Sequence, residues 1–293
     1  MDVIGRTARA RTASADLFAA ERHYNLPMQK IVSDDADIFY DVAGAGPPVI
    51  LLHPFPVNHE FWLPVTDFLS SRYRLIMPDL RGHGESELGN GPATMQKHAA
   101  DIARVMTATG VDRAPLVGVS IGGYSIFEFW RRFRDRVSGL VLCNTKASAD
   151  AVDARAIRLK AAEDVLQHGT EPFFDGMLQK VLAETTRQSR PDLVEGALRM
   201  MRRMSAEDVA GVQRGMAERP DSVSTLKTIN APVLIITGDE DNVTGVPEAE
   251  LMKQNIAGSQ MKVIAKAGHY SPWEQPQEVG KLLRQFLDSM VRG

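Results

Sequence analysis

The chain has 293 residues, of which 44% are hydrophobic and 24% charged, a composition typical of a globular protein and unlike that of a disordered, fibrous or membrane-embedded chain. Its formal net charge is −3, so no overall field attracts a phosphate backbone or an anionic lipid surface, and we expect neither nucleic acid nor membrane as a partner. A chain of this length buries about three quarters of the surface that its unfolded form exposes, and its core therefore needs no disulfide or metal.

The first 27 residues carry scattered charges and no uninterrupted apolar stretch, so they do not resemble a secretory signal. We interpret residues 1–27 as a mobile N-terminal arm. No stretch of the sequence reaches the roughly 18 consecutive apolar residues that span a bilayer. The single cysteine, Cys143, forms no intramolecular disulfide and lies in an apolar run, where a buried, inert thiol is expected. These features predict a cytoplasmic protein.

Short apolar runs begin after Met28 and alternate with helical stretches, which is typical of an α/β protein. Most of the runs are apolar throughout, as expected for parallel strands that are covered on both faces. Helical periods at residues 94–109 and 279–290 are expected to pack on the sheet. The predicted strands span residues 37–42, 49–52, 74–77, 115–119, 140–142, 233–236 and 261–264.

Residues 149–224 interrupt this alternation, because they contain helical patterns and charges but no convincing strand. We interpret this segment as a helical cap inserted after the sixth strand, and residues 28–148 and 225–293 as the core. The cap contains five methionines, which either line an adaptable apolar pocket or fill the core, the commoner role. The expected helices of the cap cover residues 150–167, 172–186, 191–203 and 206–217.

The segment 118–123, Gly-Val-Ser-Ile-Gly-Gly, follows a predicted strand and precedes the helical run 124–132. This arrangement is typical of a nucleophile elbow, a sharp strand-to-helix turn that lifts a serine hydroxyl above the sheet. Such a turn leaves no room for side chains at its flanking positions, which explains Gly118 and Gly122. A glycine-rich turn with a solvent-facing serine is the alternative, but the strand before it and the helix after it favour the elbow, with Ser120 as the nucleophile.

A serine hydroxyl is a poor nucleophile until a histidine removes its proton, and the histidine needs a carboxylate that fixes its tautomer and stabilises its charge. The segment 238–241, Gly-Asp-Glu-Asp, follows one predicted strand, and His269 follows the last one. The order serine, acid, histidine and the positions after parallel strands agree with the general placement of reactive groups in α/β sheets. From spacing alone, Asp239, Glu240 and Asp241 are all candidates for the acid.

With these motifs the chain resembles the serine-nucleophile branch of the α/β-hydrolase superfamily, over about residues 28–290. The resemblance implies the α/β-hydrolase fold, in which a mostly parallel central sheet has helices on both faces. In that family the acid comes three residues after the glycine that ends its strand, which selects Asp241, and His269 matches the family's base. The catalytic triad implied by the resemblance is Ser120, Asp241 and His269.

Residues 53–56, His-Pro-Phe-Pro, resemble the family's oxyanion loop. The resemblance implies that the backbone N–H groups of Phe55 and Ile121 form the oxyanion hole. The family's usual glycine is replaced by Pro54, which has no N–H to donate, so the hole depends on these two donors. Phe55, Trp62 and Ile121 are also candidate walls of the substrate pocket by analogy, although each could equally be ordinary core.

The segment 79–86 resembles the turn after the family's fourth strand, where Arg81 and His83 are expected to brace the turn rather than to react. His53 is expected to hydrogen-bond within its own loop. The remaining histidines lie in polar or helical settings and are expected at the surface: His23, His59, His98 and His168.

The resemblance predicts hydrolysis of a small-molecule carboxylic ester or lactone through an acyl-enzyme intermediate. The loop at residues 55–56 and the glycine pair at 122–123 make the chain similar to bacterial carboxylesterases and 3-oxoadipate enol-lactonase-like hydrolases. A cofactor-free haloperoxidase or perhydrolase and a carbon–carbon bond hydrolase are alternatives on the same triad, and a non-catalytic small-molecule-binding homologue is a remote one. The sequence contains no dinucleotide fingerprint, P-loop or zinc motif, so no cofactor and no metal are predicted.

Overall fold

The structure is a computed structural model that describes residues 28–291. The predicted N-terminal arm, residues 1–27, lies outside the described residues. Among residues 28–291, no helix is both long enough and apolar enough to cross a membrane.

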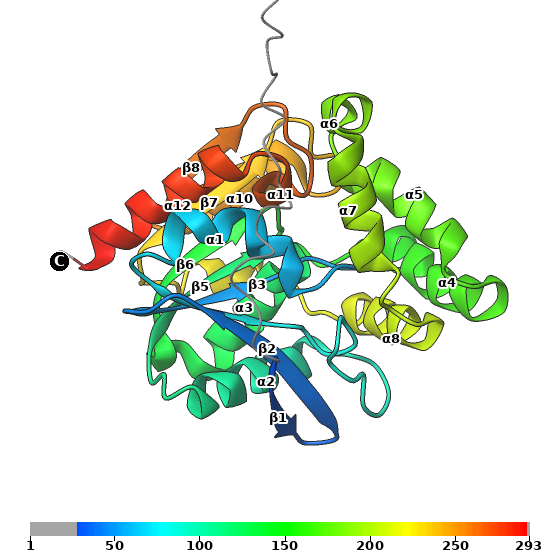
Figure 1. Cartoon of the computed structure of the whole chain (residues 1–293), viewed down its shortest axis with the longest axis horizontal. Helices are drawn as coiled ribbons and strands as arrows, with labels where there is room; N and C mark the ends of the chain where they lie inside the picture. The colour runs from blue at the N-terminus through cyan, green and yellow to red at the C-terminus, as the bar shows by residue number, and fades with distance from the viewer. Residues whose placement is uncertain (1–27, 292–293) are drawn as a thin grey trace, which may run out of the picture.

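The described strands form one eight-stranded sheet with the order β1-β2-β4-β3-β5-β6-β7-β8 (Figure 1). Strands β3 to β8 pair in parallel, whereas β2 pairs antiparallel with both β1 and β4. The mostly parallel sheet predicted from the sequence is therefore confirmed. The strands are β1 (Gln29–Ser33), β2 (Ala36–Ala43), β3 (Pro48–Leu52), β4 (Arg74–Pro78), β5 (Ala114–Val119), β6 (Val137–Cys143), β7 (Val233–Gly238) and β8 (Gln260–Ile264).

Strand β1 is absent from the sequence prediction, and its position explains why. It lies at the edge of the sheet and only its last residue, Ser33, is buried, so it carries no apolar run. The central strands behave in the opposite way: β7 is buried along its whole length, because the sheet is covered on both faces there. Cys143, the last residue of β6, is buried as expected, and burial raises the pKa of its thiol.

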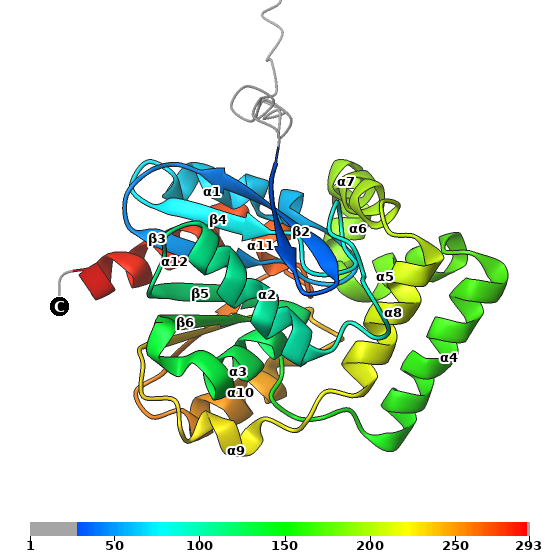
Figure 2. The same cartoon turned by 90° about the horizontal axis from the view of Figure 1, so that it is seen from below.

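Helices cover both faces of the sheet. Figures 1 and 2 place α1 and α12 together on one face and α2 and α3 on the other. In α12 the predicted apolar stripe is buried at Val279, Leu283, Phe286 and Leu287, which attaches the C-terminal helix to the core. These and the other core helices are η2 (His59–Trp62), α1 (Leu63–Leu69), α2 (Met95–Ala108), α3 (Ile121–Phe133), η3 (Arg134–Arg136), α10 (Gly245–Asn255), α11 (Ser271–Glu274) and α12 (Pro276–Val291).

A group of helices without strands follows β6, and both views place the helices of residues 152–217 at one end of the sheet. The helix expected over residues 172–186 is instead two helices, because Leu182 and Ala183 have extended backbone angles and the Ala183 N–H donates to Glu274 Oε2 at 2.8 Å. These helices are α4 (Val152–His168), α5 (Glu171–Val181), α6 (Glu184–Ser189), α7 (Pro191–Met201), α8 (Ala206–Ala217) and α9 (Val223–Leu226).

Helix α8 packs so closely on the loop before α2 that backbone atoms of the two segments are in contact. The Ala93 N–H donates to the Gly211 carbonyl at 3.1 Å, and a Cβ placed on Gly215 would lie 1.9 Å from the Ala93 carbonyl oxygen. A backbone atom cannot move aside as a flexible side chain can, so Gly215 is required for this contact.

We predict that Gly215→Ala lowers the free energy of unfolding by about 1–3 kcal/mol, because the added methyl group overpacks the contact with Ala93. The matched control is Gly176→Ala on α5, where an added Cβ meets nothing within 4 Å. This variant should gain about 1 kcal/mol from helix propensity. Urea unfolding of both variants measures the two effects, and equal stabilisation by both substitutions would contradict the proposed packing.

Candidate active site

Ser120 lies on a sharp turn between β5 and α3. Its backbone angles are φ +54° and ψ −112°, a region that residues other than glycine rarely adopt. The turn is held from the neighbouring strand, since the Ser120 N–H lies 3.2 Å from the Cys143 carbonyl and 3.1 Å from that of Asn144. On the other side, Thr145 Oγ1 donates to the Ser120 carbonyl at 2.8 Å. The predicted strand, turn and helix are all present.

The glycines around Ser120 are required by space. A Cβ on Gly118 would lie 2.6 Å from the Gly122 carbonyl carbon, and a Cβ on Gly122 would lie 2.5 Å from the Leu52 carbonyl oxygen. The predicted steric demand for small residues at positions 118 and 122 is therefore confirmed. A third restriction was not expected: a Cβ on Gly123 would lie 2.3 Å from Thr145 Oγ1, the hydroxyl that supports the turn.

The predicted acid and base lie side by side after β7 and β8. His269 Nδ1 is 3.1 Å from Asp241 Oδ2 and 3.2 Å from Oδ1. The other two acidic candidates point elsewhere. Asp239 accepts the Ala267 N–H at 3.3 Å, and Glu240 accepts the hydroxyl and N–H of Thr185. Of the three carboxylates, only Asp241 is within hydrogen-bond distance of the imidazole.

Asp241 is held as a carboxylate by several donors. Oδ1 accepts the N–H groups of Val243 at 2.8 Å and Thr244 at 3.1 Å, and Oδ2 accepts from Thr244 Oγ1 at 2.7 Å and Asn144 Nδ2 at 2.9 Å. Burial opposes ionisation, but the neighbouring His269 and the side-chain hydrogen bonds outweigh it and lower the pKa of Asp241 far below its usual value. The imidazole therefore faces a fixed negative charge.

Asn144 is a site residue that the sequence analysis missed. It follows β6 with φ +41°, and its Nδ2 bridges Asp241 and the Gly268 carbonyl at 2.9 and 3.1 Å. Its Oδ1 accepts from Ser271 Oγ. Asn144 thus connects the acid to the segments on both sides of His269. A polar residue directly after a buried parallel strand is the sequence signal that could have identified it.

The Ser120 hydroxyl and two nearby backbone N–H groups have no hydrogen-bond partner among residues 28–291. Ser120 is 8% exposed, and among residues 28–291 its hydroxyl makes no hydrogen bond. Ile121 is the first residue of α3, so its N–H has no acceptor within the helix. The Phe55 N–H likewise has no acceptor in the described part of the chain. These two N–H groups are the predicted oxyanion donors.

The predicted oxyanion loop, residues 53–56, is fixed by the side chains of His53 and Tyr270. His53 Nδ1 donates to the Pro54 carbonyl at 2.8 Å, the hydrogen bond expected within its own loop, and its Nε2 accepts the Leu80 N–H at 2.9 Å from the neighbouring turn. Burial lowers the pKa of His53 to about 3, with a smaller contribution from nearby His83. Tyr270 Oη donates to the Phe55 carbonyl at 2.9 Å. The residue after the predicted base thus holds the peptide that precedes Pro56.

The turn at residues 79–86 is also a bracing element, as predicted. Arg81 donates to Asp101 and Asp35, and His83 Nδ1 lies 3.2 and 3.1 Å from the Leu80 and Arg81 carbonyls. Burial lowers the pKa of His83 to about 4. Both side chains are buried and their contacts are internal to the protein.

Two histidines expected at the surface are buried instead. His59 is 8% exposed and its Nδ1 lies 2.8 Å from Asp79 Oδ1, so a buried carboxylate explains its position. His98 is fully buried in α2, where burial lowers its pKa well below the usual value. His168 is exposed as predicted, and His23 lies outside the described residues. The spacing of apolar residues along a predicted helix does not show whether a histidine on that helix is buried or exposed.

The three predicted wall residues, Phe55, Trp62 and Ile121, are all buried. The ring centroid of Phe55 lies 5.9 Å from that of Phe173 on α5, so the helical insertion contacts the predicted oxyanion loop. Trp62 is fully buried and packs edge-to-face on Phe61 at 5.3 Å, and its Nε1 has no partner among residues 28–291. Ile121 is fully buried beside Ser120.

No set of three or more His, Cys, Asp or Glu side chains in the described residues could hold a metal ion.

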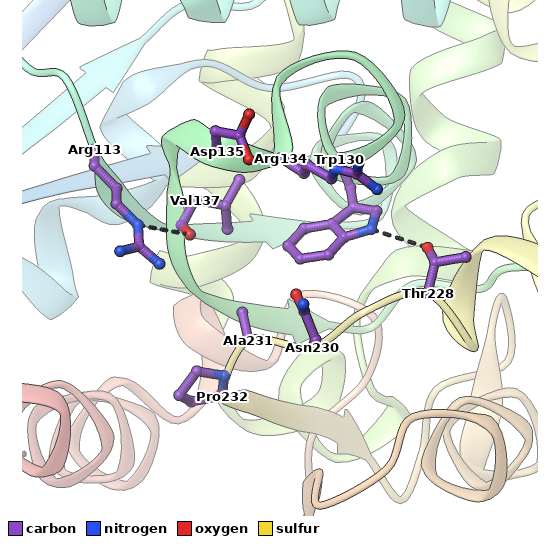
Figure 3. A pocket seen from close by; sticks show the side chains of 9 residues that line it. All are labelled: Arg113, Trp130, Arg134, Asp135, Val137, Thr228, Asn230, Ala231 and Pro232. Atoms are coloured by element: carbon purple, nitrogen blue, oxygen red, sulfur yellow. Dashed lines mark hydrogen bonds between the residues drawn. The ribbon is translucent and has the colours of Figure 1, made fainter.

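Figure 3 shows the residues that line a cavity of about 630 Å³, none of which is Ser120, Asp241 or His269. The cavity lies where β6 and β7 begin, whereas Ser120, Asp241 and His269 come after the carboxyl ends of their strands. Because these strands are parallel, the cavity and the three residues lie at opposite ends of the strands. Trp130 Nε1 donates to Thr228 Oγ1 at 3.0 Å across its wall. The cavity is lined by Arg113, Trp130, Arg134, Asp135, Val137, Thr228, Asn230, Ala231 and Pro232.

Known proteins share this fold and sequence pattern. The family model described as the alpha/beta hydrolase fold matches residues 47–276. The chain belongs to the alpha/beta hydrolase family. The fold class predicted from the sequence is thereby confirmed. The matched segment includes Ser120, Asp241 and His269.

Relatives within this alpha/beta hydrolase family include esterases and lactonases. A solved esterase from Thermogutta terrifontis is 35% identical with a TM-score of 0.87, and the match covers 90% of this chain and 99% of that one. The 3-oxoadipate enol-lactonase 1 of Acinetobacter baylyi is 29% identical over 253 residues, 84% of this chain and 90% of the relative. A solved hydrolase from Pseudomonas aeruginosa is 26% identical with a TM-score of 0.83, covering 89% and 98% of the two chains.

We predict that the buried His83 makes stability depend on pH. Its pKa is about 4 in the folded chain against an ordinary 6.5, so the unfolded chain binds more protons between these values and stability falls as the pH drops from about 6.5 toward 4. His83→Asn retains a donor for the carbonyls but does not titrate. The variant should lose about 2 kcal/mol less stability than wild type between about pH 7 and pH 5.

Urea unfolding at the two pH values measures the difference in this slope. The exposed His168→Asn is the matched control and should leave the slope of the wild-type protein unchanged. An unchanged slope in His83→Asn would contradict the assignment of a neutral, buried imidazole at this position.

Proposed function

We propose that this chain is a serine hydrolase that cleaves a carboxylic ester or lactone through an acyl-enzyme intermediate. The observation that carries the proposal is the strained turn at Ser120, which has an unpartnered hydroxyl beside the unpartnered N–H of Ile121. Strain at a single residue other than glycine is typical of functional sites, because a position without a role has no reason to retain its cost of about 1–3 kcal/mol. The esterase and enol-lactonase relatives support the same reaction class.

The proposed reaction begins when Ser120 Oγ attacks the carbonyl carbon and His269 accepts its proton. Asp241 fixes the imidazole through Nδ1, which leaves Nε2 for the proton, and balances the imidazolium charge. His269 then protonates the leaving alkoxide, and the acyl group stays on Ser120. A water molecule, deprotonated by His269, attacks the acyl-enzyme and releases the acid. Catalytic hydrogen bonds of this kind often tighten only when substrate is bound.

The proposed oxyanion hole consists of the N–H groups of Phe55 and Ile121. Each such donor contributes about 3–4 kcal/mol to transition-state stabilisation, comparable to a factor of several hundred in rate. Rigidity of the donors matters because a preorganised dipole costs no reorganisation during the reaction. The hydrogen bonds of His53 within the loop and of Tyr270 to the Phe55 carbonyl support this rigidity.

We further propose that residues 149–224 act as a cap over the site and that residues 28–148 and 225–293 form the catalytic core. The contact between Phe173 and Phe55 supports this division, because it brings α5 over the oxyanion loop. Phe55, Trp62 and Ile121 are proposed to contact the acyl or alcohol part of a small-molecule substrate. We also propose a cytoplasmic location. The proposed reaction uses no metal and no cofactor.

We predict that Ser120→Ala abolishes turnover of short p-nitrophenyl esters and covalent labelling by a fluorophosphonate probe, because both need the same hydroxyl. Ser224→Ala, at an exposed position of α9, is the matched control and should retain both activities. Probe fluorescence after gel electrophoresis and p-nitrophenol release provide the two measurements. Labelling of Ser120→Ala at the wild-type rate would place the nucleophile elsewhere.

A substrate panel on wild type and Ser120→Ala distinguishes the alternatives on the same triad. An esterase or lactonase turns over esters or lactones without peroxide. Peroxide-dependent halogenation without ester turnover would instead indicate a haloperoxidase or perhydrolase. Cleavage of a vinylogous diketone without ester turnover would indicate a carbon–carbon bond hydrolase, and binding without any turnover a non-catalytic homologue.

We predict that Asp241→Asn lowers kcat by about 10⁴-fold, because an amide at this position stabilises the wrong tautomer of His269. Asp239→Asn is the matched control: it removes the same charge two residues away, where the carboxylate has the Ala267 N–H as its one hydrogen-bond partner among residues 28–291. Its kcat should stay within about threefold of wild type. Steady-state kinetics of both variants test the choice of acid, and the reverse ranking would assign the role to Asp239.

A further inference from the structure

A second buried carboxylate lies next to His269 and has no role in the reaction described above. Glu274 ends the short helix α11 and is 4% exposed. Its Oε1 accepts the N–H groups of Gly268 at 3.0 Å and Tyr270 at 3.3 Å. These residues flank His269 on both sides, so one carboxylate oxygen fixes the peptide groups that carry the predicted base.

The other oxygen of Glu274 binds the helical insertion. Oε2 accepts the Ala183 N–H at 2.8 Å and Thr186 Oγ1 at 2.6 Å. Ala183 and Thr186 belong to the extended break between α5 and α6 and to the first turns of α6. One side chain therefore joins the loop of His269 to the insertion that contacts Phe55.

The chemistry of this contact requires a carboxylate. All four partners are donors, and a carboxylate of this size accepts from all of them, whereas a glutamine would direct its own NH₂ group at two of them. Burial raises the pKa of Glu274, while its four hydrogen bonds act in the opposite direction. Burying a carboxylate costs several kcal/mol of desolvation free energy, which an apolar side chain of the same size would not. This cost argues for a role other than packing.

Backbone contacts next to Glu274 leave little freedom for independent movement. The Tyr270 N–H also lies 3.2 Å from the Val181 carbonyl, and a Cβ on Gly268 would lie 2.4 Å from the Ala183 nitrogen. Trp273 Nε1 donates to the Leu193 carbonyl of α7 at 3.1 Å. The His269 loop and the α5–α6 break are therefore in direct contact, and the Glu274 carboxylate binds both.

We propose that Glu274 is a positioning residue: it fixes the backbone on both sides of His269 and couples that backbone to the α5–α6 break of the insertion. It acts through the Gly268 and Tyr270 peptides and does not touch the substrate. The proposal rests on the proposed function, in which His269 is the base. A displacement of the base by about 1 Å is sufficient to lower the rate about 100-fold.

The experiment compares Glu274→Gln with the matched control Glu278→Gln, which removes the same charge at an exposed position of α12. Glu274→Gln should lower kcat and the rate of fluorophosphonate labelling about 10- to 100-fold, with KM changed less than about threefold. Glu278→Gln should match wild type. Glu274→Met, similar in volume and without an amide, provides a second variant if the glutamine prevents folding, and it should show the same loss of kcat.

Hydrogen exchange measured by mass spectrometry gives a readout that does not depend on activity. Loss of the carboxylate should speed exchange in the His269 loop and in residues 181–186 together. A folded Glu274 variant with kcat within threefold of wild type, or exchange that rises in one segment alone, would overturn the proposal. A wild-type chain that neither labels nor turns over esters would overturn the proposed function instead, and the exchange data would still decide the coupling.

Discussion

The backbone of Ser120 is the constraint on which the rest of the site depends. A left-handed residue between β5 and α3 is stable only where its surroundings leave it no alternative. Gly118, Gly122 and Gly123 allow Leu52 and Thr145 to approach so closely that the turn has no space in which to relax. The turn is held by the hydrogen bonds of the Ser120 N–H to the Cys143 and Asn144 carbonyls and of Thr145 Oγ1 to the Ser120 carbonyl.

The same principle applies to the acid and the base. Asp241 accepts hydrogen bonds from Val243, Thr244 and Asn144, and Asn144 connects it to the Gly268 carbonyl. On the far side, Glu274 fixes the backbone around His269 in a similar way. The two carboxylates have different partners: Asp241 contacts the imidazole, whereas the partners of Glu274 in the described part of the chain are three peptide N–H groups and a hydroxyl. The proposed acid and base are therefore held in place by the polar groups around them, Asn144 on one side and Glu274 on the other.

Sequence patterns predicted the elements that carry strong periodicity or strict spatial demands. The apolar runs of β3 to β7 and the elbow glycines follow from burial and from steric exclusion, which act locally. The pattern did not reveal edge strand β1, buried His59 and His98, or the break at Leu182 and Ala183. Strand β1 lacks an apolar run because it is an exposed edge strand, whereas the break depends on a partner distant in the chain: the Ala183 N–H donates to Glu274, which lies 91 residues away. Asn144 was missed for the same reason, since its partners come from three other segments.

The proposed mechanism requires a covalent intermediate on Ser120, which can be detected by acid-quenched mass spectrometry during turnover of p-nitrophenyl acetate. We expect a mass increase of one acetyl group on the peptide that contains residue 120, which appears early in the reaction and disappears when the ester is consumed. Hydrolysis of the ester with no acetylated peptide at any time point, or acetylation of a different residue, would contradict a covalent intermediate on Ser120.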